Sequence, residues 1–210
     1  MILYLVTGCS GYRFTQQENP LSQYGIQSLS IPMFYNYSNL SGVSGEFTRE
    51  TYRLLTSYSG LKLISGYSED SDAVLIGIIK TQERLKDSLR PGSMRVAKGQ
   101  APVSVGSDRQ NFYIPGSTSI NVVLQVIVIK KPTEEEIALL KSGIGDQIEQ
   151  TSRVIFNVAL PLTSQFTREV LDGEGTDVIA TQNSGIQRRT VRTLAEQAAL
   201  SIRDMILYAF

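Results

Sequence analysis

Residues 120–129 read INVVLQVIVI, and this stretch decides the fold class. All of it except Asn121 and Gln125 is apolar, and most of the apolar residues are the β-branched Val and Ile. Such side chains lose rotamer freedom in a helix but pack well on a pleated surface. The stretch therefore predicts a strand at the heart of a β-sheet.

The C-terminal region, from about Arg188 to Tyr208, predicts a helix that covers this sheet. Polar residues such as Arg192 and Glu196 face away from a stripe of apolar residues at helical spacing. The stripe consists of Val191, Leu194, Ala195, Ala198, Ile202, Met205 and Ile206. A helix with one apolar face packs that face against a sheet or another helix.

Weaker patterns predict the remaining strands. Alternating or continuous apolar residues indicate strands over 26–34, 61–64, 72–79 and 153–162. We expect Pro32 to mark an edge or the end of the first of these strands, and the last to break near Pro161, because proline cannot donate to a ladder.

Two further segments have helix signals. A helix is expected over 46–58, with Ser44 as its N-cap and Gly60 at its end. Residues 132–150 begin like a helix, with Thr133 and Glu136 forming a capping box, before two glycines weaken the pattern. The whole order predicts an α+β two-layer sandwich: one mixed or antiparallel sheet of four to five strands, with two helices packed on one face.

A length of 210 residues suits a single domain. We expect this domain over residues 26–210, with a long loop at about 80–115, a polar loop over 163–185 and an insertion at about 132–150. The segment at 80–115 either forms an irregular loop or extends two strands into a hairpin. The polar residues that precede the domain, up to residue 25, read as a tether.

The composition argues against catalysis and against nucleic-acid binding. The chain has no His and only one Cys, so the commonest acid/base group, a disulfide and a thiolate zinc site are all missing. Lys plus Arg and Asp plus Glu number 20 each, so no net field steers the protein onto nucleic acid. We expect a binding protein that is not an enzyme and that uses no metal or cofactor.

The single cysteine, Cys9, closes the N-terminal stretch MILYLVTGC. Small residues at Thr7 and Gly8 after apolar Leu5 and Val6 resemble the lipobox of bacterial lipoproteins, in which the Cys is acylated and the preceding signal is removed. We therefore expect residues 1–8 to be a signal-peptide remnant and residues 9–25 to be the lipidated Cys and its tether. The alternative is a first strand followed by a small buried cysteine.

Basic residues gather in the segment between residues 84 and 98, where Asp87 is the only acid. Arginine binds phosphate oxygens in a bidentate manner and lysine acts as a point charge, so Arg90, Arg95 and Lys98 are candidate ligands for an anionic group. The alternative is a solvated loop without a ligand. A second cluster, Arg188, Arg189 and Arg192, lies where the last helix is expected to start.

Several stretches taken in order resemble the LptE family of lipopolysaccharide-assembly lipoproteins. After the Cys comes SGYRF, and the chain continues with IPMFYNYS, GEFTRETYRLL, GLKLIS and SDAVLIGII, and ends with RTLAEQAALSIRDMI. The resemblance covers roughly residues 8–80 and 186–208. It implies the same two-layer fold and a lipid anchor on the periplasmic side of the outer membrane. It also implies a role as plug of the barrel protein LptD and as a lipopolysaccharide-binding component in assembly at the cell surface.

The alternative is an envelope lipoprotein of similar outline that acts as a structural or regulatory module for a secretion channel or a cell-wall synthase. The aromatic and basic segment directly after Cys9 favours the first reading.

Overall fold

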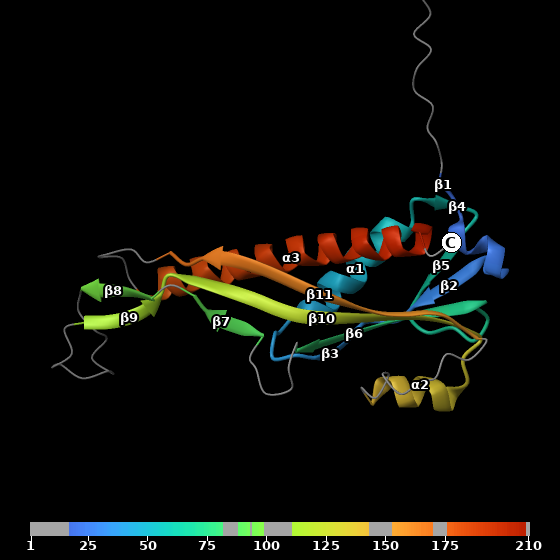
Figure 1. Ribbon diagram of the computed structural model, residues 1–210, viewed down its shortest axis with the longest axis horizontal. Coiled ribbons are helices and arrows are strands. Elements are labelled where there is room, and N and C mark those ends of the chain that lie inside the picture. Colours follow the sequence, from blue (N-terminus) through green and yellow to red (C-terminus); the bar gives the residue numbers. More distant parts are fainter. Residues whose placement is uncertain are drawn as a thin grey trace, which may run out of the picture.

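The computed structural model describes residues 17–81, 88–92, 94–98, 111–142, 153–169 and 176–208. It confirms the α+β class: helices lie against a mixed sheet that runs along the length of the molecule (Figure 1). The sheet contains seven strands, more than the four to five expected. They are β2 (Ser28–Ile31), β3 (Tyr35–Tyr37), β5 (Lys62–Ser65), β6 (Ala73–Thr81), β7 (Leu89–Pro91), β10 (Ser117–Lys130) and β11 (Val154–Thr167).

The stretch that decided the fold class forms the middle of β10, which organises the sheet. The main path runs β11, β10, β6, β2, β5, while β3 also pairs with β6 and β7 with β10. β10 is antiparallel to β11, β6 and β7, whereas β2 is parallel to β5 and β6. Two small pairs lie outside this sheet: β1 (Gln17–Glu18) with β4 (Tyr58–Ser59), and β8 (Met94–Lys98) with β9 (Asn111–Pro115).

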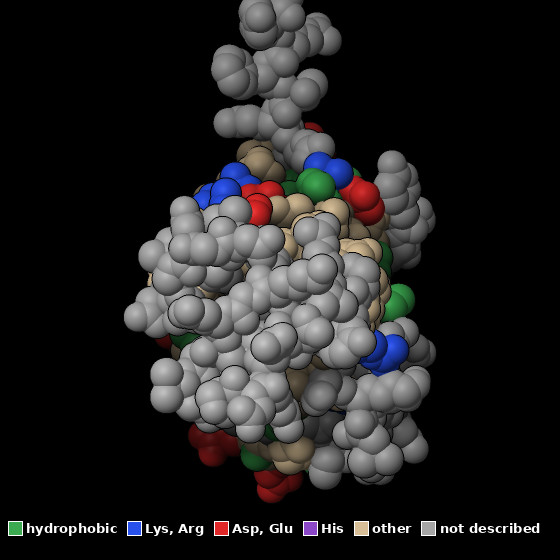
Figure 2. Space-filling view, turned by 90° about the vertical axis from the view of Figure 1, so that its left-hand side faces the viewer, with side chains coloured by type: hydrophobic (Ala, Val, Ile, Leu, Met, Phe, Trp, Pro, Cys, Tyr) green, Lys and Arg blue, Asp and Glu red, His purple; other side chains and the backbone are tan. Residues whose placement is uncertain are grey.

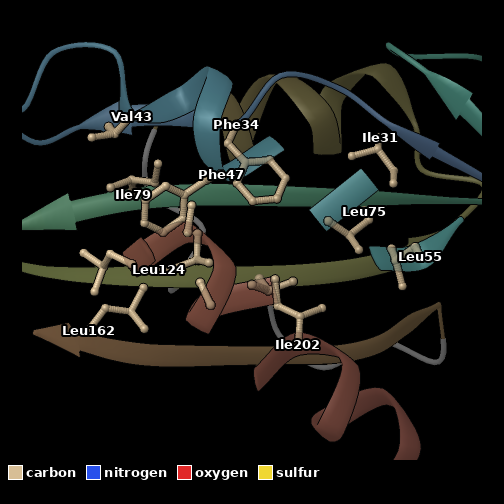
Figure 3. Packing of buried hydrophobic residues seen from close by; sticks show 14 of the residues in the cluster. Ile31, Phe34, Val43, Phe47, Leu55, Leu75, Ile79, Leu124, Leu162 and Ile202 are labelled. Atoms are coloured by element: carbon tan, nitrogen blue, oxygen red, sulfur yellow. The ribbon is translucent and has the colours of Figure 1, made fainter. Parts of the chain in front are cut away.

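The expected strand over 26–34 is two strands, because the chain turns at Pro32. Strand β2 ends at Ile31 and β3 begins at Tyr35, farther along the same neighbour β6. Between them the Phe34 backbone N–H donates to Thr48 Oγ1 at 2.9 Å. The Phe34 ring lies directly over Gly77 of β6, where a Cβ atom would overlap it. Figure 3 shows Phe34 beside the strand that carries Leu75 and Ile79.

The expected break near Pro161 does not occur. β11 continues through Pro161, which pairs with Val123, and ends at Thr167. The Asn121 N–H donates to Ser88 O at 2.9 Å, and Ser88 lies beside β7, on the side of β10 away from β11. Odd-numbered residues of β10 therefore direct their backbone groups away from β11, and their odd-numbered partners in β11 direct theirs away from β10. The nitrogen of Pro161 therefore faces the open side of an edge strand, where no ladder bond is lost.

Two helices, α1 (Val43–Leu55) and α3 (Thr176–Tyr208), cover one face of the sheet as expected (Figure 1). They bury the stripe of α3 and the apolar side of α1 against even-numbered residues of β10, including Leu124 and Val126. Both helices start earlier than predicted. The N-cap of α1 is Gly42 in the left-handed region (φ 75°) instead of Ser44, and α3 takes up the second half of the expected loop over 163–185.

A third helix, α2 (Glu134–Lys141), lies on the opposite face of the sheet (Figure 1). It forms the helical part of the predicted insertion, and its Thr133 and Glu136 make the expected capping box. Leu140 packs on a small second core of Val74, Ile76, Ile78, Ile127 and Ile129. The molecule is thus a two-layer sandwich with a partial third layer.

Asp72 ties the start of β6 to the start of β2. Its Oδ2 accepts hydrogen bonds from the backbone N–H of Gln27 (3.0 Å) and Ser28 (2.8 Å) and from the Ser28 hydroxyl (2.8 Å). Ser28 Oγ in turn accepts from Asp72 N–H at 2.9 Å. The hydroxyl bond and the two backbone bonds hold the pKa of the Asp72 carboxyl below its ordinary value.

Asp72→Asn is expected to lower the free energy of unfolding at pH 7 by about 1–2 kcal/mol, because charge-assisted bonds to a half-buried carboxylate are lost. Because the pKa of the Asp72 carboxyl is lower in the folded than in the unfolded protein, its charge stabilises the fold at pH values above the unfolded-state pKa of about 3.9. This stabilisation is lost as the pH falls through the folded-state pKa. The difference from wild type, measured by urea unfolding, should therefore shrink below about pH 4. Asp70→Asn is the control at an exposed neighbouring acid; an equal loss in both variants would contradict the role of Asp72.

Candidate functional site

The segment at 80–115 contains strands wherever the structure describes it. β7 joins the main sheet beside the start of β10, and β8 and β9 form a separate antiparallel ribbon of five residues a strand. The paired strands differ from the long loop expected here, and the pairing of β8 with β9 agrees with the alternative of a hairpin; residues 82–87 and 99–110 lie outside the described residues. The ribbon projects from one end of the molecule, beyond β10 and β11 (Figure 1).

The three candidate ligand residues do not share one irregular loop, which corrects the sequence interpretation. Arg90 lies in β7, is half-buried, and pairs with Ser119 of β10, whose hydroxyl donates to the Arg90 carbonyl at 3.4 Å. Arg95 and Lys98 lie in β8, opposite Ile114 and Asn111 of β9. The structure places all three at the same end of the molecule but divides them between two sheets. Arg84 and Lys86 lie outside the described residues.

The side of the molecule on which α1 and α3 lie carries charges of both signs. Figure 2 looks along the molecule from the ribbon end and shows Lys and Arg side chains next to Asp and Glu side chains along this upper side. These helices contain the second arginine cluster that the sequence indicated. Arg188, Arg189 and Arg192 are well inside α3, which begins at Thr176, and not at the start of the helix as expected.

Arg192 belongs to an ion-pair cluster that joins α3 to α1. The centre of the cluster is Glu50, whose side chain is 2% exposed. Its Oε2 accepts from Arg53 Nε at 2.7 Å, its Oε1 accepts from Arg49 Nη2 at 3.2 Å, and Arg192 Nε lies 4.0 Å from Oε1. Burial alone would raise the pKa of Glu50, but the bonds from Arg53 and Arg49 outweigh it and the pKa is lowered. Glu50 is therefore a buried anion that holds three arginines along the helix pair.

The sequence interpretation did not single out Glu50, although a signal for it was present. Residue 50 lies three positions after Phe47 and four before Leu54, so helical spacing puts it on the same face as these two apolar residues. A carboxylate in an apolar stripe needs cationic partners, and Arg53 three positions later is the nearest one at helical spacing.

A pocket of about 620 Å³ opens beside this cluster, between the start of α1 and α3. Its lining is mostly polar: Ser41, Gly42, Glu46, Ser184, Gln187, Arg188 and Val191. Glu46 forms an ion pair with Arg49, so the pocket contains a compensated acid. The helix pair thus offers a polar surface with interleaved charges, which suits a protein or headgroup contact.

Cys9, the predicted acylation site, lies outside the described residues. The first described element is β1, which pairs with β4 at the end of the molecule opposite the β8–β9 ribbon (Figure 1). Asn19 fixes the chain here: its Oδ1 accepts from Leu21 N–H at 2.9 Å and its Nδ2 donates to Ile26 O at 2.8 Å. These bonds hold the short 3-10 helix Pro20–Tyr24 against the fold, and Leu21 lies in the main core. Residues 17–25 are therefore part of the folded domain, which corrects the expectation that the tether extends to residue 25.

No helix in the described part of the chain is both long enough and apolar enough to cross a membrane. Among the same residues, no three His, Cys, Asp or Glu side chains lie together so that they could hold a metal ion.

No protein-family model matches this chain. No curated protein matches it either. Solved structures with a similar chain path include a Caulobacter crescentus protein with 8% identity and a TM-score of 0.38, covering 83% of this chain and 87% of that one. Another is the rare lipoprotein B of Shewanella oneidensis, with 10% identity, a TM-score of 0.34 and coverage of 85% and 92%. A third is the lipoprotein GNA1162 of Neisseria meningitidis, with 7% identity, a TM-score of 0.34 and coverage of 77% and 96%. Such remote likenesses concern the course of the chain alone.

Proposed function

We propose that this protein is an envelope lipoprotein, acylated on Cys9, that works by binding and not by catalysis. In the finer form of the proposal it is anchored on the periplasmic side of the outer membrane. There it partners the LptD barrel as plug and lipopolysaccharide-binding component during assembly of lipopolysaccharide at the cell surface. The lipobox-like stretch and the ordered LptE-like motifs of the sequence support this role.

The observation that carries the proposal is the separation of the chain's two functional ends. The tether that follows Cys9 enters the fold through β1, at one end of the sheet, and the strands bearing Arg90, Arg95 and Lys98 lie at the other (Figure 1). β10, which connects these ends, has 14 residues and is therefore about 45 Å long. A protein anchored through Cys9 could present its basic end far from its own anchor, where an anionic ligand held by a partner would meet it.

Replacing Arg90, Arg95 and Lys98 together with Ala is expected to weaken binding to purified lipopolysaccharide by about tenfold or more. Arginine and lysine contacts to phosphate are each worth about 1.5–3 kcal/mol when desolvated and much less when they remain in water. The melting temperature is measured alongside, because Arg90 is half-buried in β7 and a loss of fold would also lower binding. Binding of the wild type should also weaken as salt is raised.

The matched control removes three exposed basic residues elsewhere, Lys62, Arg188 and Arg189. Unchanged binding in this control, with a loss in the first variant, supports the ribbon end as the binding surface. If the control loses binding and the first variant keeps it, the ligand lies on α3 or beside Lys62 of β5 instead. Affinity purification of the membrane-extracted protein tests the partner: recovery without any β-barrel protein would refute the barrel role.

A further inference from the structure

The two edges of the main sheet differ in length and in charge. At one edge of the described sheet, β5 has four residues and carries the exposed Lys62. At the other edge, β11 has 14 residues, VIFNVALPLTSQFT, and none of them is charged. Proteins usually protect an open edge with short strands, lysine or proline, because its free backbone groups accept another strand. β11 has Pro161 alone, so most of its length stays open to a further strand.

The backbone groups that point outward from β11 follow from its register with β10. From Phe156 onward, even-numbered residues of the two strands bond to each other, as in the pair Val122 and Leu162. Odd-numbered residues of β11 direct their backbone groups away from β10, as Pro161 does. The outward amides include those of Asn157, Ala159, Thr163 and Gln165. Within the described residues, no other strand pairs with this side of β11.

A second copy of the chain offers the same free edge, and the two edges fit each other across a two-fold axis. Such an axis makes the two strands antiparallel, and the outward odd-numbered residues of one strand then face those of the other. With the axis at Pro161, Ala159 lies opposite Thr163 of the second copy, and Asn157 lies opposite Gln165 of that copy. The two prolines face each other at the axis, so the bonds lost to proline are confined to the middle of the ladder.

The side chains of this register agree on both faces of the extended sheet. On the helix-covered face, Phe156 lies opposite Phe166 of the second copy, and Leu160 lies opposite Leu162. Phe156 and Leu160 pack on the main core but are only partly buried, so the second copy would cover them further. On the other face the pairs are small or polar, and no pair on either face brings two charges together. The edge is therefore complementary to itself.

We propose that β11 is a self-association edge: the β11 strand of a second copy adds to it antiparallel, across a two-fold axis at Pro161. Strand addition obtains its affinity from main-chain hydrogen bonds, and the absence of charge from both strands leaves these bonds unopposed by repulsion. The same patch serves both copies, so the assembly closes at two and does not grow into a fibre. The dimer is a state of the free protein and does not rest on the function proposed above. A barrel that encloses one copy has to displace the other.

The first experiment measures the mass of the full acylated protein by sedimentation equilibrium, in a mild detergent whose density matches that of the solvent. Amide hydrogen exchange is followed residue by residue over the same range of protein concentration. We expect an equilibrium between monomer and dimer. Exchange at the four outward amides named above should slow by about tenfold or more as the dimer forms, since these amides gain acceptors. The amides of Val158 and Leu162 already bond to β10 and serve as the internal control.

Two matched double variants test the register. Ala159→Lys with Thr163→Lys puts like charges opposite each other at two places in the dimer, and should raise its dissociation constant by about tenfold or more. Ala159→Lys with Thr163→Glu changes the same two positions but puts opposite charges together. Its dissociation constant should stay within about threefold of wild type. Both variants should melt alike, because both positions are exposed in the single chain.

Each outcome decides the inference. A dimer with slower exchange at the outward amides, which the like-charge variant weakens and the opposite-charge variant keeps, supports it. A protein that stays monomeric up to its solubility limit overturns it, and so does a dimer in which the outward amides exchange as fast as in the monomer. Equal dissociation constants for the two double variants overturn the two-fold axis at Pro161 and the inference with it. None of these measurements involves lipopolysaccharide or a barrel, so the inference can fail while the proposed function stands.

Discussion

Gly77→Ala is expected to lower the free energy of unfolding by about 3 kcal/mol. Gly77 lies in the middle of β6 and the Phe34 ring covers it, so a methyl group at this position would overlap three ring atoms. Phe34 is 2% exposed and belongs to the main core. Overpacking of a core costs about 1–3 kcal/mol, and a displaced aromatic ring also gives up part of its burial. Urea unfolding followed by circular dichroism measures the change.

Gly45→Ala is the matched control. Gly45 lies in the first turn of α1, and no atom lies within 4 Å of the position of an added Cβ. Alanine is the better helix former there, so this variant should be more stable by about 0.5–1 kcal/mol. If Gly77→Ala unfolds at the same urea concentration as wild type, Phe34 does not cover β6 as described.

Cys9→Ser is expected to abolish fatty-acid labelling and to move the protein from the membrane fraction to the soluble fraction. A hydroxyl cannot replace the thiol that receives the diacylglycerol of a lipoprotein, and no other cysteine exists in the chain. Each buried methylene of an acyl chain contributes about 0.8 kcal/mol, so losing all the acyl chains removes most of the membrane affinity.

Ser10→Ala controls for a change next to the acceptor that leaves the thiol in place, and this variant should label like wild type. Equal labelling of wild type and Cys9→Ser would mean that the stretch before Cys9 is not a lipobox. Fractionation of Cys9→Ser tests the lipid anchor alone. Partner binding is a separate measurement, because it depends on the folded domain and not on the acyl chains.

Strong local patterns predicted the strands and helices that form the core. The β-branched run of β10, the stripe of α3 and the capping box of α2 lie where the sequence placed them, because each depends on neighbours within a few residues. The missed features depend on pairing between distant residues. The break expected at Pro161 depends on which side of β11 its nitrogen faces, and register alone decides that.

The extra turns of α3 show a similar limit. Residues 181–185, TQNSG, are polar and include Gly185, so local propensity favoured a loop. In the fold, Asn183 accepts from the Glu169 backbone N–H at 2.9 Å and donates to the Glu169 carbonyl at 3.1 Å, which ties the early helix to the end of β11. The same limit applies to the candidate site. The sequence shows that basic residues cluster between 84 and 98, but only the strand pairing reveals that Arg90 belongs to the main sheet and Arg95 and Lys98 to a separate ribbon.

The position of α3 at the C-terminus bears on how the chain is made. Every strand of the main sheet precedes α3, yet α3 supplies much of the cover over Leu124, Val126 and their neighbours. A nascent chain that has emerged only as far as residue 175 holds all the strands of the main sheet, but only α1 is present to cover their apolar face. We expect such an intermediate to bind a holding chaperone until α3 has emerged, and stop codons within the 33 codons of α3 should yield products that proteases remove.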